Sequence, residues 1–274
     1  MTPSVVILTF NEEPNIERCL SSLGDLDDVL LIDSGSTDRT VEIAEGMGAR
    51  VLRRAFDDFA GQRNFALESG ALRHDWVLHL DADEELTDAF RAALRDLRGE
   101  DTLDGYRVPS KTMLNGAWLR HAGMYPTYQV RIGHRDRLRF KQVGHGQREA
   151  SPPERIGTFD VPYLHHNFSH GLAAWFAKHV RYASDEADQA LRERAEAGDA
   201  AATTGDRTEG RRSLKRLANR LPEFVRPFAR FAYVYFVRRG ILDGRAGFLY
   251  ASMLAIYEGM IAVLIAERSS RNAR

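Results

Sequence analysis

The chain has 274 residues, a formal net charge of −1 and a sequence pI near 6.8. This length can bury one large α/β core or two modest domains, and the near-neutral charge argues against nucleic acid as a partner. Cys19 is the only cysteine, so no disulfide can form within the chain, which fits a reducing compartment. Because the first predicted strand begins almost at once, we expect no signal peptide.

Four apolar runs dominate the first 100 residues, and each is followed by a polar turn and a helical pattern. The runs predict strands over residues 5–9, 29–32, 48–52 and 75–80. Helices are expected from Pro14, from Thr40 and over residues 62–67, and Thr87 is the expected N-cap of a fourth helix. Strands that alternate with helices predict βαβ units and a parallel sheet.

The pattern changes after residue 104. Short strands separated by turns are expected to complete a mixed sheet, over residues 105–109, 117–120, 128–132 and 138–140. Residues 172–190 predict a helix. The polar, Ala-rich residues 186–209 are either a helix with a frayed end or a flexible linker.

Two carboxylates follow the fourth predicted strand. Asp81 and Asp83 stand one residue apart at the carboxyl end of that strand, which is where open α/β sheets bind ligands. Hard divalent cations prefer such oxygen ligands and often share them with substrate phosphates. The alternative is a polar turn that caps the next helix.

Together with three other motifs, this acidic segment resembles the inverting family 2 glycosyltransferases. The likeness is carried by residues 7–13, 31–40, 61–66 and 80–84. The sequences of the two middle motifs are similar to those of bacterial lipopolysaccharide core glucosyltransferases. The likeness is clear over residues 1–100, moderate to about residue 190 and general beyond. The resemblance implies an α/β GT-A (Rossmann-like) fold, with a mixed, mostly parallel sheet flanked by helices and a C-terminal helical extension.

The same resemblance implies four segments. Residues 1–100 would be the nucleotide-sugar-binding half of the GT-A domain, and residues 101–190 its acceptor-side half. A polar linker or helix would follow over residues 191–221, and C-terminal amphipathic, membrane-associating helices over residues 222–274.

The resemblance also assigns roles to site residues. Asp83, helped by Asp81, would hold Mg²⁺ or Mn²⁺ against the diphosphate of a UDP-sugar donor. Asp81 would also lie near the ribose. The other nucleotide-binding candidates are Thr9, Glu12, Asp33 and Arg63; turn chemistry is the alternative for the first two, a helix N-cap for Asp33, and a solvated helix position for Arg63.

An inverting mechanism needs a general base near the acceptor hydroxyl. In the lipopolysaccharide branch a Val-His-Glu element follows an Arg-Phe strand. Here His145 is retained, but Gly146 replaces the adjacent acid. We therefore favour Glu149, the next carboxylate downstream, with His145 as the second candidate or a diphosphate contact. The alternative for Glu149 is an exposed strand acid. For His134, His165 and His166 we expect local hydrogen bonding rather than a metal site.

The C-terminal segment combines apolar and basic residues. Residues 247–266 are long enough to span a bilayer, but Glu258 lies near their middle, which costs roughly 3 kcal/mol on insertion scales. Upstream, aromatic residues alternate with arginines over residues 226–239, a pattern that suits a helix lying in the headgroup region. We expect peripheral contact with an anionic membrane surface; packing against the catalytic domain is the alternative, and a true span comes last.

These features predict a metal-dependent inverting glycosyltransferase. It would move a sugar from a nucleotide donor to a lipid-linked or cell-envelope glycan acceptor, such as lipopolysaccharide core, at the inner face of the cytoplasmic membrane. A sugar-phosphate nucleotidyltransferase is disfavoured because residues 9–13 lack the Gly-rich, Arg-ending loop of that class. A non-catalytic nucleotide-binding membrane scaffold is disfavoured by the pair Asp81 and Asp83.

Overall fold

The computed structural model of the protein describes residues 1–144, 146–199 and 222–272, which divide into two compact units. The first unit holds Met1–Met113 and Met124–Ser169. The second holds Leu114–Gly123 and His170–Arg274.

The first unit is built on a mixed, mostly parallel sheet, as expected. Its parallel part consists of β3 (Arg50–Arg53), β2 (Val29–Asp33), β1 (Ser4–Thr9) and β4 (Trp76–Asp81). The sheet continues through β8 (Thr127–His134), β6 (Gly105–Leu114), β12 (Tyr163–His165) and β5 (Glu84–Glu85). Strand β8 runs antiparallel to both of its neighbours, β4 and β6. It therefore joins the parallel strands of residues 1–81 to the later strands of the same sheet.

Helices cover both faces of this sheet because each strand alternates its apolar side chains between two cores. One core packs α1 (Glu13–Ser21), α2 (Thr40–Gly46) and α4 (Asp88–Asp96) against the sheet. The other packs α3 (Phe59–Glu68). The hydroxyl of Thr87 accepts a hydrogen bond from the N–H of Phe90 at 3.1 Å, so the expected N-cap of α4 is confirmed.

Smaller strands complete the first unit. Strand β11 (Ile156–Thr158) pairs with β6, and Pro153–Arg155 forms the short helix η1. The short strand β7 (Ala117–Trp118) belongs to the second unit. Strands β9 (Phe140–Val143) and β10 (Gly146–Glu149) form a separate antiparallel ribbon. The side chain of Asn64 in α3 bonds both the N–H and the carbonyl oxygen of Phe140 at 2.9 Å, which fixes the ribbon on α3.

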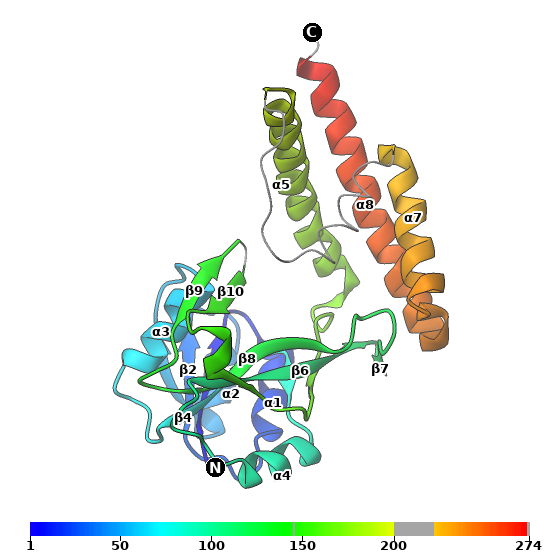
Figure 1. Ribbon diagram of the computed structural model, residues 1–274. Coiled ribbons are helices and arrows are strands. Elements are labelled where there is room, and N and C mark those ends of the chain that lie inside the picture. Colours follow the sequence, from blue (N-terminus) through cyan, green and yellow to red (C-terminus); the bar gives the residue numbers. More distant parts are fainter. Residues whose placement is uncertain (145, 200–221, 273–274) are drawn as a thin grey trace. The chain divides into compact units, whose positions relative to one another are not determined.

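The second unit is helical. In Figure 1, α5 (Gly171–Asp199) and α7 (Arg226–Ala232) run alongside α8 (Gly244–Asn272). Alanines 183 and 187 of α5 pack on Ile261 and Ile265 of α8, and the small side chains allow a close approach of the two helices. Between α7 and α8 lie the π-helix η3 (Tyr233–Val237) and the 3₁₀ turn η4 (Gly240–Asp243), and η2 (Glu223–Val225) precedes α7.

Within the described ranges, the stretch Gly240–Arg271 alone is long and apolar enough to cross a membrane, judged by length and composition, with a mean hydropathy of 1.9.

The boundary between the units differs from the one expected near residue 190. That position lies inside α5, whose apolar face packs on α8, so the contacts divide the chain after Ser169 instead. The segment Leu114–Gly123 also belongs to the helical unit. It is bound there because the carboxylate of Asp243 accepts the N–H groups of His121 and Ala122 at 2.9 and 2.8 Å. Residues 191–199 are helical, whereas residues 200–221 lie outside the described part of the chain.

Candidate active site

Three polar residues end adjacent strands at one edge of the sheet. Thr9 lies opposite Asp33 in the β1–β2 pair, and Leu8 lies opposite Asp81 in the β1–β4 pair. Because these strands are parallel, their carboxyl ends meet at the same edge. The structure therefore brings Thr9, Asp33 and Asp81 together, as the strand-end positions predicted.

Asp33 organises the turn that follows β2. Its side chain is buried and accepts hydrogen bonds from the hydroxyl of Thr9 at 3.1 Å, from the hydroxyl of Ser36 at 2.5 Å, and from the N–H groups of Gly35 and Ser36 at 3.0 Å. These four donors occupy both oxygens of the carboxylate. Asp33 therefore holds the backbone of the turn in a fixed form beside the end of β1.

The turns after β1 and β2 are tied to each other. The N–H of Asn11 donates to the hydroxyl of Ser36 at 2.9 Å, and the side-chain oxygen of Asn11 accepts the N–H of Thr37 at 2.8 Å. Glu12 donates its own N–H to the hydroxyl of Thr40 at 2.7 Å. Its carboxylate accepts a hydrogen bond from Asn15 at 2.6 Å, at the start of α1.

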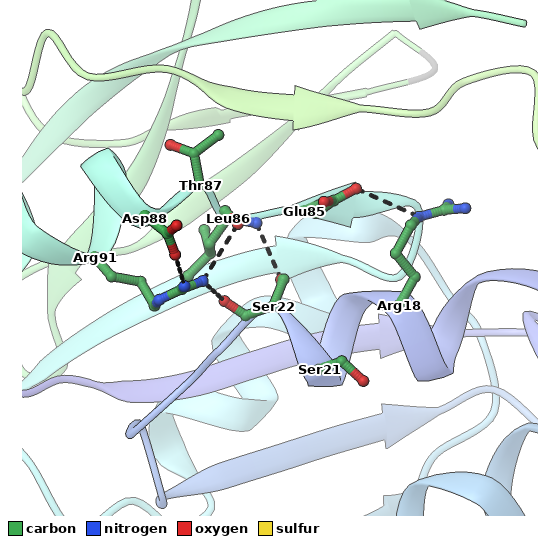
Figure 2. Close-up of a pocket in the computed structure, with 8 residues that line it drawn as sticks. All are labelled: Arg18, Ser21, Ser22, Glu85, Leu86, Thr87, Asp88 and Arg91. Atoms are coloured by element: carbon green, nitrogen blue, oxygen red, sulfur yellow. Dashed lines mark hydrogen bonds and ion pairs between the residues drawn. The ribbon is translucent and has the colours of Figure 1, made fainter. Parts of the chain in front are cut away.

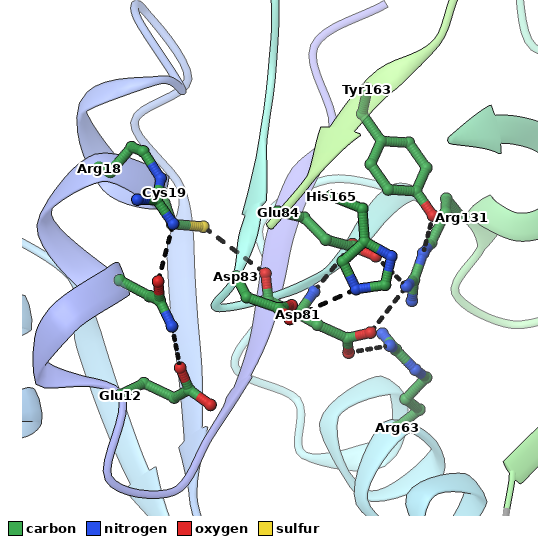
Figure 3. A network of polar contacts seen from close by, with 11 residues as sticks. Glu12, Arg18, Cys19, Arg63, Asp81, Asp83, Glu84, Arg131, Tyr163 and His165 are labelled. Carbon is green, nitrogen blue, oxygen red and sulfur yellow. Dashed lines mark hydrogen bonds and ion pairs between the residues drawn. The ribbon is translucent and has the colours of Figure 1, made fainter. Parts of the chain in front are cut away.

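Two buried arginines hold Asp81 (Figure 3). Arg63 of α3 lies 2.6 Å from one carboxylate oxygen, and Arg131 of β8 lies 2.7 Å from the other. Burial disfavours the charge of Asp81, but the charges of Arg131 and Arg63 outweigh it and hold the pKa of Asp81 well below its ordinary value. The side chain is still 34 % exposed, so an ionised carboxylate faces the site.

Arg131 also links Asp81 to the next acidic residue. Its guanidinium forms an ion pair with Glu84 and donates to the hydroxyl of Tyr163 at 3.2 Å. A carboxylate oxygen of Glu84 in turn accepts the backbone N–H of Asp81 at 3.0 Å. Burial raises the pKa of Glu84 to about 7 against the opposing charge of Arg131. These contacts fix the backbone of the acidic segment to β8 and β12.

Asp83 has a different environment. It is bound by one cationic group, the ring of His165, whose Nε2 atom lies 3.4 Å from its carboxylate. Burial alone would lower the pKa of His165, but the hydrogen bond and charge of Asp83, together with Glu84 and Asp81, raise it to about 9. The neighbouring His166 bonds Glu85 at 2.8 Å. Both histidines thus make the local hydrogen bonds that we expected for them.

The chemistry of Asp83 and His165 fits a divalent cation. A carboxylate oxygen and an imidazole nitrogen are both metal ligands, and here they face each other at the sheet edge. Within the part of the chain that the structure describes, no group of three or more His, Cys, Asp or Glu side chains could hold a metal ion. The other ligands of a bound cation would therefore come from substrate phosphates and water, which is usual for Mg²⁺.

Arg63 is positioned to act through Asp81. It is buried, its guanidinium lies 5.9 Å from the centre of the Phe140 ring, and its Nε and Nη1 atoms have no hydrogen-bond partner among the described residues. The ring of Phe140 also packs edge-on against His79 of β4 at 5.1 Å. The solvated helix position, which was the alternative for Arg63, is thus excluded because the side chain is buried.

The structure places only one of the two candidates for the general base. Glu149 pairs with Phe140 across the β9–β10 ribbon, and directly opposite side chains of an antiparallel pair share a face. Glu149 therefore lies on the face that Phe140 turns toward α3 and β4. His145 lies outside the described residues.

A hollow of about 460 Å³ lies between α1 and the start of α4, next to the acidic segment (Figure 2). Its cations already have partners in the protein. Arg91 bonds Asp88 and the carbonyl oxygen of Ser22, and Arg18 lies 3.7 Å from Glu85. We therefore place the candidate site at the ends of β1, β2 and β4 rather than in this hollow.

Residues 4–159 match the family model described as glycosyl transferase family 2. The chain belongs to this family. An "Uncharacterized glycosyltransferase" of Rickettsia bellii (strain RML369-C) is 38 % identical over 104 residues, which are 38 % of this chain and 35 % of that protein. The matched region thus spans about a third of the length of this relative.

A longer match covers nearly the whole chain. The "Lipopolysaccharide core biosynthesis glycosyltransferase LpsC" of Rhizobium meliloti (strain 1021) is 26 % identical over 282 residues, which cover 99 % of this chain and 94 % of LpsC. Among solved structures, glucosyl-3-phosphoglycerate synthase from Mycobacterium tuberculosis in complex with Mn²⁺, UDP and glucosyl-3-phosphoglycerate is similar at 20 % identity and a TM-score of 0.41. That match covers 61 % of this chain and 72 % of the other.

Sequence reasoning gave no role to three residues of the site, Glu84, Arg131 and Tyr163, and expected only local hydrogen bonding for His165. One signal was present, because Arg131 stands as a charged residue between Val130 and Ile132 in a predicted strand. A buried arginine needs an acidic partner. The pattern of the strand does not say which acid that is.

Proposed function

We propose that this chain is a metal-dependent inverting glycosyltransferase that moves a sugar from a nucleotide donor, a UDP-sugar, to a lipid-linked or cell-envelope glycan acceptor. The observation that carries the proposal is the position of Asp83. Its carboxylate, 24 % exposed and facing His165, follows the end of β4, beside the strand ends that carry Thr9 and Asp33. A diphosphate bound across these ends would meet the cation site directly.

The nucleoside would bind over β1 and β2. The turn that Asp33 holds in place, together with Thr9 and Glu12, would form the wall for the base and the ribose. The exposed edge of Asp81 would accept a hydrogen bond from a ribose hydroxyl. Arg63 would keep Asp81 in position rather than contact the diphosphate, because its guanidinium is buried.

The cation would be held by Asp83, and His165 could join it as a ligand only after its ring has lost its proton. Mg²⁺ or Mn²⁺ bound there stabilises the negative charge that develops on the leaving diphosphate. Asp81 as a further metal ligand stays a prediction. Each of its carboxylate oxygens already accepts a hydrogen bond from an arginine, so a cation would have to share these oxygens with the arginines.

The acceptor hydroxyl would lose its proton to a base on the β9–β10 ribbon. Glu149 is the first candidate and His145 the second. General bases of this kind typically contribute 10²–10⁴-fold to the rate.

The acceptor is proposed from the relative that matches the whole chain. LpsC is named for lipopolysaccharide core biosynthesis, and an acceptor of that class is linked to lipid. We propose that the protein works as a peripheral protein on the inner face of the cytoplasmic membrane, where its helical unit would contact anionic lipid.

Calorimetry with UDP and UDP-sugars, with and without Mn²⁺, tests the donor. We expect UDP to bind in the presence of Mn²⁺ and binding to weaken at least tenfold when EDTA is added. Turnover of the bound sugar nucleotide to UDP separates an enzyme from a scaffold that only binds. Release of pyrophosphate from UTP and a sugar phosphate would instead identify a nucleotidyltransferase and refute the proposal.

A further inference from the structure

The turn that joins α7 to α8 exposes large apolar side chains. Phe236 and Val237 of η3 and Ile241 and Leu242 of η4 are between 49 % and 70 % exposed. We call these four residues the apolar corner. Scattered exposed apolar residues are ordinary, but four within seven consecutive positions form a patch.

A tight backbone turn forms the apolar corner. Arg239 adopts a left-handed conformation with φ of 60°, which turns the chain between η3 and η4. Gly247 closes the turn, since a Cβ atom there would lie 1.9 Å from the carbonyl oxygen of Gly240. A Cβ atom on Gly240 would in turn meet the carbonyl oxygen of Val234 at 2.7 Å. Both positions therefore require glycine if the backbone is to make this close turn.

Cationic side chains flank the apolar corner. Arg238 and Arg239 stand between its two halves, and Arg245 follows it in α8. Asp243 is the only acid between Phe236 and Arg245, and its carboxylate accepts the N–H groups of His121 and Ala122. The corner therefore combines exposed apolar side chains with neighbouring positive charge, which complements a surface with anionic headgroups above hydrocarbon.

We propose that the apolar corner inserts into an anionic lipid surface, and that the body of α8 does not. The inference rests on the proposed function, since a lipid-linked acceptor is presented at such a surface. Burying these side chains would supply the affinity, and the arginines would contribute about 1 kcal/mol each near anionic lipid. The corner, rather than the long apolar helix, would then decide how the protein meets the membrane.

The body of α8 offers a matched control. Val263 is as exposed as the corner residues but lies within α8, about 28 Å from the start of that helix at a rise of 1.5 Å per residue. A helix that lies in the surface or spans the bilayer would bury Val263 as well. An inserted corner would leave it in water.

Co-sedimentation of the full chain with vesicles of phosphatidylcholine and phosphatidylglycerol tests the proposal. We expect the double variant Ile241→Ser, Leu242→Ser to bind at least tenfold more weakly than the unaltered protein, and Val263→Ser to bind equally well. Arg239→Gln combined with Arg245→Gln should weaken binding to these vesicles, and pure phosphatidylcholine vesicles should bind little protein. Thermal unfolding confirms that each variant folds.

Binding of UDP with Mn²⁺ in the absence of lipid is measured in parallel. If the unaltered protein binds nucleotide but no vesicles, the corner proposal fails and the proposed function stands. If Val263→Ser weakens vesicle binding as much as the corner variant does, α8 itself lies in the membrane and the proposal is overturned. If vesicles bind and nucleotide does not, the proposed function fails instead.

Discussion

The guanidinium of Arg131 lies 2.7 Å from the carboxylate of Asp81, although 50 residues separate them in the chain. Arg63 approaches the other oxygen of the same carboxylate, and both arginines are buried. Two buried cations thus share this partly exposed anion, and Arg131 has Glu84 as a second acidic partner. Asp83, two residues on, has His165 as its cationic partner. The two aspartates of one short motif should therefore respond differently to substitution.

Replacing Asp81 with Asn should destabilise the fold. The change leaves the buried Arg63 without its ion-pair partner and Arg131 with Glu84 alone, and breaking a buried pair costs about 3–5 kcal/mol. Asp83→Asn should cost less, because its one cationic partner, His165, can lose its proton, whereas the arginines beside Asp81 cannot. Urea unfolding of both variants measures the difference. Equal losses would contradict the division of roles between the two residues.

Replacing Asp83 with Ala should abolish transfer and the metal dependence of UDP affinity while the fold stays intact. The change removes a ligand that would balance the charge of the diphosphate. Isothermal titration with UDP, with and without Mn²⁺, measures the affinity. Asp88→Ala, at an exposed carboxylate of α4, is the matched control. Turnover by Asp83→Ala near the unaltered rate, in the presence of EDTA, would remove the metal from the proposal.

Replacing Glu149 with Gln should lower kcat by at least ~10²-fold, the effect of a lost general base, with little change in UDP binding. The amide keeps the shape of the side chain but accepts no proton. Glu154→Gln, at an exposed position of η1, should be near neutral. Steady-state kinetics of the two variants measure the effect. If His145→Ala is inactive while Glu149→Gln stays active, the base is His145.

Replacing Asp28 with Asn should make the protein less stable at neutral pH and equally stable in acid. Burial opposes ionisation of Asp28, but the hydrogen bonds of Ser4 and of the Arg73 N–H, with the charge of Arg50, outweigh it and lower its pKa from the ordinary 3.8. A carboxylate whose pKa is lowered by folding contributes stability above its unfolded pKa. That contribution is lost as the pH falls through the folded value.

The expected difference at pH 7 is about 1.5–3 kcal/mol, the contribution of hydrogen bonds to a charged group. Urea unfolding of both proteins from pH 7 downward measures it, and the gap should close only below about pH 4. Asp136→Asn, at an exposed carboxylate, should show almost no gap at any pH. A gap for Asp28→Asn that stays constant down to pH 3 would contradict the linkage.

The sequence by itself determined the parallel half of the sheet and the edge at which the site lies. Each strand there is a local apolar run, and each ends in the polar residues that follow it, so Thr9, Asp33 and Asp81 could be placed from local pattern alone. The capping of α4 by Thr87 was predictable for the same reason, because a cap involves only the next three residues.

Only the tertiary structure decided which side chains surround the acidic motif. Arg131, Tyr163 and His165 reach Asp81, Asp83 and Glu84 because β8 inserts antiparallel beside β4 and β12 pairs with β5. Strand order depends on how all the apolar faces of the sheet and helices are buried together. The local periodicity of the sequence therefore does not predict it. The same holds for the apolar corner: the sequence shows its aromatic, aliphatic and arginine residues, but only the structure shows that its four apolar side chains are exposed.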